Sequence, residues 1–171
     1  PEPMVEEAGI EGGDLAEQYH QASYGAHFCE VAVHAWTGEV RVRRMRGVFA
    51  AGRILNHRTA TSQCLGGMIW GIGAALTEEL AHDPRDGHIA TRDLANYHVA
   101  CHADVSDIEA SFLEERDDHS NPMQSKGIGE LSISGAGAAV INAIANAAGV
   151  RVRDYPATPD KVIAAMEAQG R

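Results

Sequence analysis

The order of hydrophobic patterns along the chain predicts an α+β fold. Residues 25–53 contain two stretches in which apolar and polar residues alternate, as in strands, on either side of a turn. A stretch with helical spacing follows at 59–79, then a short alternating stretch at 105–114 and two further helical stretches. The order β-β-α-β-α-α is typical of the α+β class. With 171 residues, the chain is long enough for one domain with a sizeable core.

The segment 25–53 predicts a β-hairpin. Cys29, Val31 and Val33 alternate with polar neighbours, and residues 36–39, Trp-Thr-Gly-Glu, supply a turn. The return strand carries a basic cluster, which fits the solvated face of a strand or a surface that meets an acidic partner. The cluster consists of Arg41, Arg43, Arg44 and Arg46.

The segment 59–79 predicts an amphipathic helix, because its apolar residues recur at spacings of three and four. This apolar stripe consists of Leu65, Met68, Ile69, Ile72, Leu76 and Leu80. Four glycines interrupt the same segment, namely Gly66, Gly67, Gly71 and Gly73. Each glycine costs about 1 kcal/mol relative to alanine inside a helix. Their number therefore predicts that something packs very close to this helix.

Three shorter elements complete the expected fold. Residues 105–114 predict a strand. Ser134 is a candidate N-cap for a helix that Gly149 would end. Thr158, followed by Pro159 at the first helical position, predicts the start of a final helix.

Composition and charge limit the kinds of partner. The chain has 14 basic and 24 acidic residues and a net charge of −10, which argues against nucleic-acid binding. No run approaches the roughly 18 apolar residues of a membrane span. The three cysteines, Cys29, Cys64 and Cys101, form neither a disulfide framework nor a CxxC metal motif.

The N-terminal part predicts how the chain is organised. Residues 1–22 are acidic and irregular, which predicts an arm or linker before a single domain over 23–171. The chain begins with Pro1 and shows no signal-peptide pattern. We therefore expect a processed, truncated or excised piece of a longer protein.

The segment 121–137, NPMQSKGIGELSISGAG, is the strongest candidate site. Backbone N–H groups beside its glycines can approach an anionic ligand closely, and Lys126 can add a positive charge. Glu130 follows directly and is the last charged residue before Arg151. We expect apolar neighbours to hold this carboxylate away from water, which would suit a general base. The alternative is an acid near a helix N-terminus that the helix dipole stabilises, with no catalytic role.

Other motifs give weaker signals. The sequence GIGAAL at 71–76 lacks the third glycine of a dinucleotide fingerprint and lies inside a predicted helix. His98, Cys101 and His102 have the spacing of metal ligands, but a fourth ligand at matching spacing is missing. The sequence has no GxSxG motif, and none of its cysteines has a local base. A metal-binding module therefore ranks last among the functions considered.

Several motifs together resemble one known family. In order, they are YGAHFCEVAVHAWTGEVRV, GRILNHRTATSQCLGGMIWGIGAALTEE, LANYHV, NPMQSKGIGE and GVRVRDYPATPDKV. They resemble the C-terminal portion of the molybdopterin-binding subunit in the xanthine oxidase and aldehyde oxidase family of molybdenum hydroxylases. The likeness extends from Tyr24 to Met166 and is greatest for bacterial aldehyde oxidoreductases built from separate subunits. Cys101 and Ser106 depart from the pattern, since the family commonly carries proline there.

The resemblance implies roles for the matching residues. Glu130 would be the catalytic base toward a hydroxyl on the molybdenum, and Gln63 would hydrogen-bond the cofactor near the metal. Thr61 and Ser62 would be further contacts. The residues that approach or wrap the pterin would be Gly66, Gly67, Ser125, Lys126, Gly127, Ile128 and Gly129. No side chain of this sequence would bind the metal directly, because the pterin holds it.

The resemblance also implies a reaction and partners. Aldehydes would be oxidised to carboxylic acids, or N-heterocycles hydroxylated, with water as the oxygen source. The cofactor would be a molybdopterin-type molybdenum cofactor, of which a cytosine dinucleotide form is one option. Electrons would leave through [2Fe-2S] clusters and FAD in partner subunits, because three cysteines cannot hold a cluster. The rest of the molybdenum subunit would be a separate chain, in the cytoplasm or periplasm of a bacterium. The alternative is a detached, non-catalytic assembly domain in which Glu130 is only structural.

Overall fold

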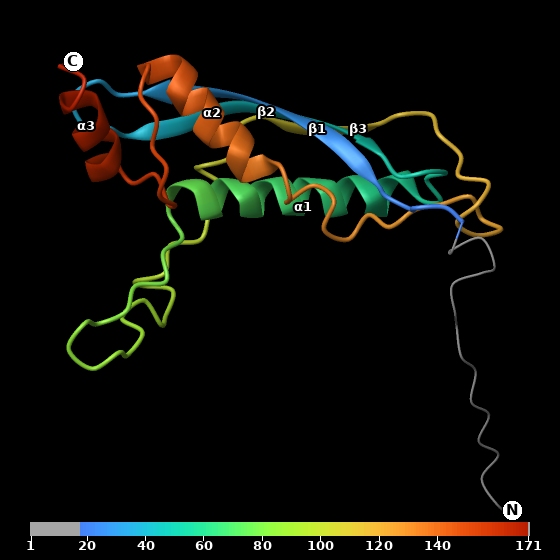
Figure 1. Cartoon of the computed structure of the whole chain (residues 1–171), viewed down its shortest axis with the longest axis horizontal. Coiled ribbons are helices and arrows are strands. Elements are labelled where there is room, and N and C mark those ends of the chain that lie inside the picture. Colours follow the sequence, from blue (N-terminus) through green and yellow to red (C-terminus); the bar gives the residue numbers. More distant parts are fainter. Residues whose placement is uncertain (1–17, 171) are drawn as a thin grey trace, which may run out of the picture.

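The computed structural model describes residues 18–170 and arranges them in two layers, a three-stranded sheet and the helices that cover one face of it (Figure 1). The elements are β1 (Tyr24–Val33), β2 (Val40–Ala50), α1 (His57–Leu76), β3 (Ile108–Phe112), α2 (Ala136–Ala148) and α3 (Pro159–Glu167). This order confirms the predicted α+β class. Residues 1–17, most of the expected acidic arm, lie outside the described part of the chain. Within that part, no helix combines the length and the hydrophobicity that a bilayer crossing needs.

β1 and β2 form the predicted antiparallel hairpin, and β3 adds to β2 in parallel. One irregularity interrupts the hairpin. Glu30 lies opposite Arg44, whereas the next residue, Val31, lies opposite Val42, so that Arg43 is an extra residue in a β-bulge. The bulge exposes Arg43 and Arg44 side by side, although a regular strand would turn neighbouring residues to opposite faces.

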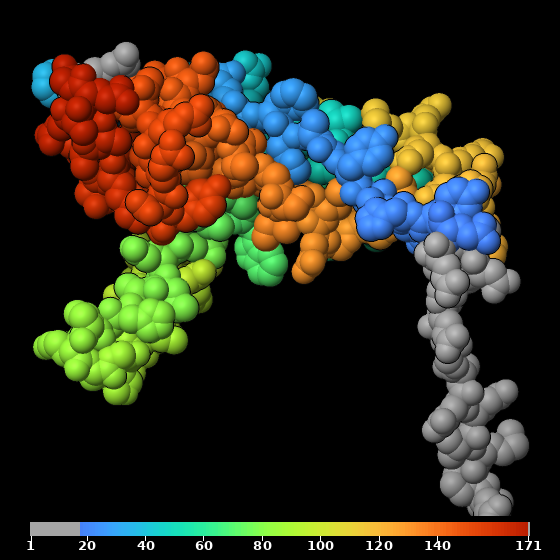
Figure 2. All heavy atoms as spheres, in the orientation of Figure 1, coloured from blue at the N-terminus to red at the C-terminus, as the bar shows by residue number. Residues whose placement is uncertain are grey.

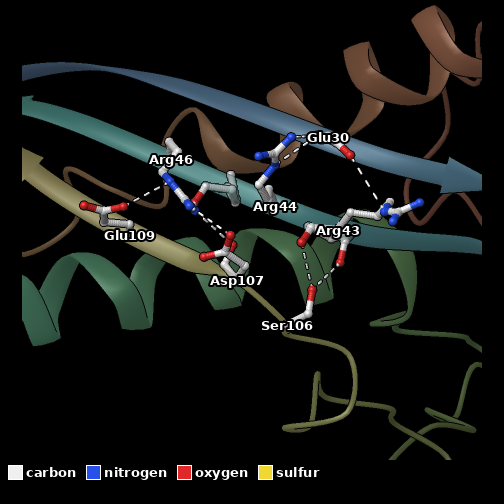
Figure 3. A network of polar contacts seen from close by, with 9 residues as sticks. Glu30, Arg43, Arg44, Arg46, Ser106, Asp107 and Glu109 are labelled. Atoms are coloured by element: carbon white, nitrogen blue, oxygen red, sulfur yellow. Dashed lines mark hydrogen bonds and ion pairs between the residues drawn. The ribbon is translucent and has the colours of Figure 1, made fainter.

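The basic cluster lies on the solvated face of the sheet, where acidic residues of the same chain pair with it (Figure 3). The Arg44 Nε donates a hydrogen bond to Glu30 at 3.0 Å, and Arg46 forms ion pairs with Asp107 at 2.9 Å and Glu109 at 3.1 Å. Such exposed pairs contribute little to stability, but they neutralise the arginines. The predicted solvated strand face is therefore confirmed, and the charges needed for an acidic partner are already occupied.

The hydrophobic core lies between the inner face of the sheet and helices α1 and α2, with Phe49 fully buried near its centre. The Phe49 ring fills space that two glycines leave, since a Cβ on Gly25 or Gly47 would lie 2.5 Å from it. The ring also packs against those of His27 and Phe112, with centroid distances of 5.2 and 6.3 Å. Other large buried members of the core are Met45, Met68, Ile72, Val140 and Ile144.

The predicted apolar stripe of α1 is only partly correct. The buried face runs at a spacing of four through Cys64, Met68 and Ile72, and the other predicted members within the helix flank it half-buried. Leu80 does not belong to it, because the backbone leaves the helical conformation directly after Leu76. Leu80 is 57% exposed.

Three of the four glycines in α1 allow close packing of this chain against itself. A Cβ on Gly67 would overlap with the Ser132 hydroxyl, and a Cβ on Gly71 would overlap with the methyl of Ala136, the first residue of α2. The Glu78 side chain covers Gly73 in the same way. The predicted close approach is thus confirmed at these three positions. Gly66 is the exception, with no atom within 4 Å of a Cβ placed on it.

The contrast between Gly66 and Gly71 predicts opposite effects of one substitution. Gly71→Ala should destabilise the fold by about 1–3 kcal/mol, because Ala136 cannot rotate away and α1 and α2 must separate. Gly66→Ala should instead stabilise it by up to about 1 kcal/mol, since the methyl group enters open space in a helix. Urea unfolding of the two variants would measure both effects. An equal loss of stability in both would contradict this account of the α1–α2 contact.

The two C-terminal helices begin and end largely as predicted. Gly149 ends α2 in the left-handed conformation, with φ 71°, and Thr158 directly precedes α3, so both predictions are confirmed. The predicted N-cap Ser134 is wrong, because α2 is preceded by Gly135. The Ser134 hydroxyl instead donates a hydrogen bond to a backbone carbonyl of the turn before the helix, at 3.0 Å.

Residues 78–98 form an arm that extends away from the two layers beyond the end of α1 (Figures 1 and 2). The Thr77 hydroxyl donates to the His98 carbonyl at 2.7 Å, and the Tyr97 hydroxyl donates to Glu78 at 2.9 Å, which closes the base of the arm. Among the described residues, none between α1 and β3 joins the hydrophobic core. The arm nevertheless exposes large apolar side chains, namely Leu80, Ile89 and Leu94.

Candidate functional site

The structure brings together the two segments that carry most of the predicted site residues. They are the N-terminal half of α1 and residues 125–135, here called the Glu130 loop. The Gln63 side-chain amide on α1 donates a hydrogen bond to the Gly129 carbonyl at 2.7 Å, across 66 positions of sequence. Ser132, which is fully buried, lies against Gly67 of the same helix. The close helix contact that Gly67 permits therefore seats this loop on α1.

Further hydrogen bonds hold the backbone of the Glu130 loop on both sides of Glu130. The Lys126 N–H donates to the Ala51 carbonyl at 2.9 Å, and the Ser23 hydroxyl donates to the Gly127 carbonyl at 2.5 Å. Beyond Glu130, the His27 Nε2 donates to the Ser132 carbonyl at 2.8 Å. A carbonyl only accepts, so this bond requires the proton on Nε2 of His27.

Glu130 lies in the turn between these anchored points, with its side chain exposed. Within residues 18–170, its carboxylate takes part in no hydrogen bond or ion pair. The expectation that apolar neighbours desolvate it is therefore wrong for this chain by itself. The helix-dipole alternative is weakened as well, because α2 begins only at Ala136 and dipole effects fade beyond the first turn.

A hollow of about 490 Å³ lies beside the Glu130 loop, between the end of β2 and the start of α1. Five predicted site residues line it, namely Gln63, Ser125, Lys126, Ile128 and Gly129. The lining also includes Asn56 and Thr59, which the sequence analysis missed. Asn56 is the N-cap of α1, and an asparagine just before a helical pattern was the available signal. Thr61, Ser62, Gly66, Gly67, Gly127 and Glu130 lie outside the lining.

A larger hollow of about 600 Å³ lies at the other end of α1, near Leu76 and Thr77. Apolar residues such as Val42 and Ile72 line it together with Asp104. None of the predicted site residues lines this hollow, so its size alone does not make it the candidate site.

At three positions of the predicted site, the fold of the described chain does not require the residue to be glycine. A Cβ on Gly66, Gly127 or Gly129 would meet no atom within 4 Å, and none of the three has a positive φ. Neither close packing nor backbone conformation therefore requires glycine there. Room for a ligand outside this chain is a physical reason that fits all three. The residues present thus fit the close approach of a large cofactor.

Lys126, which was predicted to place a positive charge beside a ligand, is paired within the described chain. Its side chain is only 7% exposed, and the ammonium lies 2.6 Å from Glu115 Oε1. The positive charge that was expected to act on a ligand is therefore paired with the half-buried Glu115 of the same chain. The sequence analysis did not identify Glu115. It lies in a polar, acidic stretch, and nothing in the local pattern shows which glutamate will pair with a lysine 11 residues later.

The same pair predicts a pH dependence of stability. The hydrogen bond from Lys126 holds the pKa of Glu115 below its usual 4.5, and the Gly52 N–H contributes in the same direction. A lowered pKa in the folded state stabilises the fold at pH values above the usual 4.5, and this contribution is lost as the pH falls through the lowered pKa. The wild-type protein should therefore have a larger free energy of unfolding than Glu115→Gln at neutral pH. The two values should approach each other as the pH falls into the acid range.

Urea unfolding at a series of pH values would measure this difference. Glu114→Gln is the matched control, because Glu114 is an exposed neighbour whose substitution should leave the pH dependence unchanged. A difference between wild type and Glu115→Gln that stays constant from neutral to acid pH would contradict the assignment.

The metal-module alternative finds no support. In the described part of the chain, no three histidine, cysteine or acidic side chains come close enough to hold a metal ion, and His98, Cys101 and His102 do not converge. All three cysteines are free. Burial raises the pKa of the Cys29 thiol to about 11, so this thiol stays protonated at neutral pH.

Comparison with known proteins gives consistent results. The model of the molybdopterin cofactor-binding domain family matches residues 8–106. The chain is 52% identical over 160 residues to the aldehyde oxidoreductase molybdenum-binding subunit PaoC of Escherichia coli K12, covering 94% of this chain and 22% of that protein. It is 35% identical to the probable hypoxanthine oxidase XdhD of the same organism, covering 84% of this chain and 15% of that protein. The chain thus spans about a fifth of the length of these relatives.

Solved structures agree with this likeness. The aldehyde oxidoreductase from Desulfovibrio desulfuricans superimposes with a TM-score of 0.76 at 33% identity, over 84% of this chain and 15% of that chain. Quinoline 2-oxidoreductase from Pseudomonas putida superimposes with a TM-score of 0.77 at 29% identity, over 84% and 18%. Because the family model covers more than half of the sequence, the chain belongs to the molybdopterin cofactor-binding domain family.

Proposed function

We propose that this chain is part of a molybdenum hydroxylase that oxidises aldehydes to carboxylic acids or hydroxylates N-heterocycles, with Glu130 as the general base. The observation that carries the proposal is the contrast within the Glu130 loop, whose backbone is anchored at Gly127, Gly129 and Ser132 while the carboxylate is free. A base needs such a fixed position together with an unoccupied carboxylate. The 52% identity to a subunit named for aldehyde oxidation supports the substrate class.

Gln63, Ser125, Gly127, Ile128 and Gly129 would hold the molybdopterin cofactor, together with the open face at Gly66. Thr61 and Ser62 would be further contacts on α1. When bound, the cofactor supplies two-electron oxidation with an oxygen atom that comes from water. For an aldehyde the balance is RCHO + H₂O → RCOOH + 2e⁻ + 2H⁺. The part of this chain is to orient the cofactor and to accept one proton at the Glu130 carboxylate.

Water solvates an exposed carboxylate and can itself take up protons. For Glu130 to be an efficient base, further protein must cover it and exclude water. We infer that the remainder of the molybdenum-binding subunit supplies this cover, because the chain spans only 22% of the relative PaoC. Iron–sulfur and FAD subunits would take the two electrons, as the resemblance implies. Part of the hydroxylase site would thus lie outside this chain.

The second candidate is a non-catalytic assembly domain, and the arm favours it. Residues 78–98 expose Leu80, Ile89 and Leu94 without contributing to the core, as a segment that meets another chain would. The two candidates differ in one experiment on the complex purified through a tag on this chain. Glu130→Gln should abolish turnover and leave the molybdenum content unchanged if the chain is catalytic. It should leave both unchanged if the chain only assists assembly.

A further inference from the structure

The ion pair between the enclosed Lys126 side chain and the half-buried Glu115 joins the Glu130 loop to the segment after β3. The Lys126 ammonium lies 2.6 Å from Glu115 Oε1 and 5.3 Å from the centre of the Tyr24 ring, at the start of β1. With 7% of its side chain exposed, Lys126 is among the most enclosed charged groups described. A charge in such a place is retained only where its partner compensates for the lost hydration.

Glu115 also reaches a third segment, the end of β2. Its second oxygen, Oε2, accepts a hydrogen bond from the Gly52 N–H at 3.1 Å. Gly52 pairs with Ser125 in an isolated antiparallel bridge and has φ +65°, with no room for a Cβ beside the Gln124 carbonyl. One carboxylate thus links the backbone just after β2 to Lys126, the second residue of the Glu130 loop.

The backbone at Gln124, two residues before Lys126, requires this support. Gln124 has φ 61°, the left-handed conformation that non-glycine residues rarely adopt. Its carbonyl accepts hydrogen bonds from the N–H groups of Arg53 at 2.7 Å and Asp117 at 3.1 Å. Such a conformation persists only where the surroundings determine it. The segments that hold Gln124 are those that Glu115 and Lys126 tie together.

From these contacts we propose that the Lys126–Glu115 pair is a positioning device for the Glu130 carboxylate, acting through the loop backbone, with the Lys126 ammonium bound to Glu115 and not to the cofactor. The inference rests on the proposed function and assigns to Lys126 a role different from the pterin contact that the sequence motif implies. Lys126 lies four positions before Glu130, with three residues between them, so a shift at the pair displaces the carboxylate. A displacement of about 1 Å can lower a rate by about 100-fold.

The test uses the complete complex with Lys126→Met and Glu115→Gln. Both variants should lower kcat by up to about 100-fold, with KM and molybdenum content close to wild type. Both should also speed hydrogen exchange at the backbone amides of residues 124–130. Lys126→Arg, which keeps the charge, should restore part of kcat. Lys161→Met is the matched control, because Lys161 is the other lysine of the chain and lies on α3, outside the site.

Two outcomes would overturn the proposal. One is loss of molybdenum in Lys126→Met but not in Glu115→Gln, which would make Lys126 a cofactor contact. The other is unchanged exchange and unchanged kcat in both variants. If Lys126→Met fails to assemble, Glu115→Gln and Lys126→Arg still decide between these results. Glu130→Gln, measured in the same complex, distinguishes failure of this proposal from failure of the proposed function. Retained turnover in Glu130→Gln would contradict the proposed function, whereas the hydrogen-exchange result for the Lys126 and Glu115 variants would still stand.

Discussion

Replacing Glu130 by glutamine is expected to lower turnover of the assembled complex by about 10²–10⁴-fold, the usual contribution of a positioned acid or base. Glutamine has nearly the same shape but cannot accept the proton. The change should not affect folding, because the Glu130 side chain is exposed and forms no hydrogen bond or ion pair among residues 18–170. Steady-state kinetics and metal analysis on the same preparation would measure turnover and molybdenum content.

Glu114→Gln provides the control for this result. Glu114 is also an exposed glutamate, but it lies after β3 and outside the Glu130 loop. Its substitution should leave turnover unchanged. A loss of turnover in Glu130→Gln alone would then show that the location of the carboxylate matters, and not only the removal of one negative charge. Turnover at the wild-type rate in a molybdenum-loaded Glu130→Gln complex would show that another group accepts the proton.

Phe49→Ala is expected to cost about 3–5 kcal/mol of the free energy of unfolding, the range for removing a buried aromatic side chain. The upper part of this range applies because two of the neighbours that form the wall of the site are glycines. Gly25 and Gly47, which flank the ring, have no side chains that could move inward. A chain of this size should lose roughly 2–4 °C in Tm for each kcal/mol.

Removal of the Phe49 ring should also loosen the Glu130 loop. His27 packs edge-on against the Phe49 ring and donates the hydrogen bond that holds the Ser132 carbonyl in the Glu130 loop. Phe49→Leu, which retains most of the apolar volume, should give a smaller loss of stability. Thermal and urea unfolding of both variants would measure the effect, and equal stabilities for alanine and wild type would contradict the assigned core.

Local chemistry explains why much of the fold could be predicted. The hairpin, the final helix start at Thr158 and the helix end at Gly149 each depend on a few neighbouring residues, so their patterns are visible in the sequence. The helix containing the four glycines was predicted for the same reason. The tight packing at Gly67 and Gly71 could be expected, but its partners, Ser132 and Ala136, lie more than 60 residues away.

Features that depend on distant contacts could not be predicted. The sequence places Lys126 in a motif that suggests a positive charge for a ligand, and only the fold brings Glu115 into contact with it. The exposure of Glu130 likewise depends on what surrounds the chain and not on its own sequence. Under the proposed function, further protein would cover this residue. The β-bulge left one trace, because the adjacent Arg43 and Arg44 interrupt the strict alternation of the strand.

Under the proposed function, the arm at residues 78–98 would keep contact with a partner apart from the catalytic Glu130 loop. It leaves the body after α1, returns before β3 and contributes no residue to the hydrophobic core among the described residues, so its exposed apolar side chains are not needed for core packing. Its length is also weakly constrained, because doubling a flexible loop raises the closure cost by only about 0.6 kcal/mol. Exchange of the arm between relatives should therefore transfer partner preference while Glu130 and the core beneath it stay the same. If so, chains with the same Glu130 loop could enter different complexes through different arms.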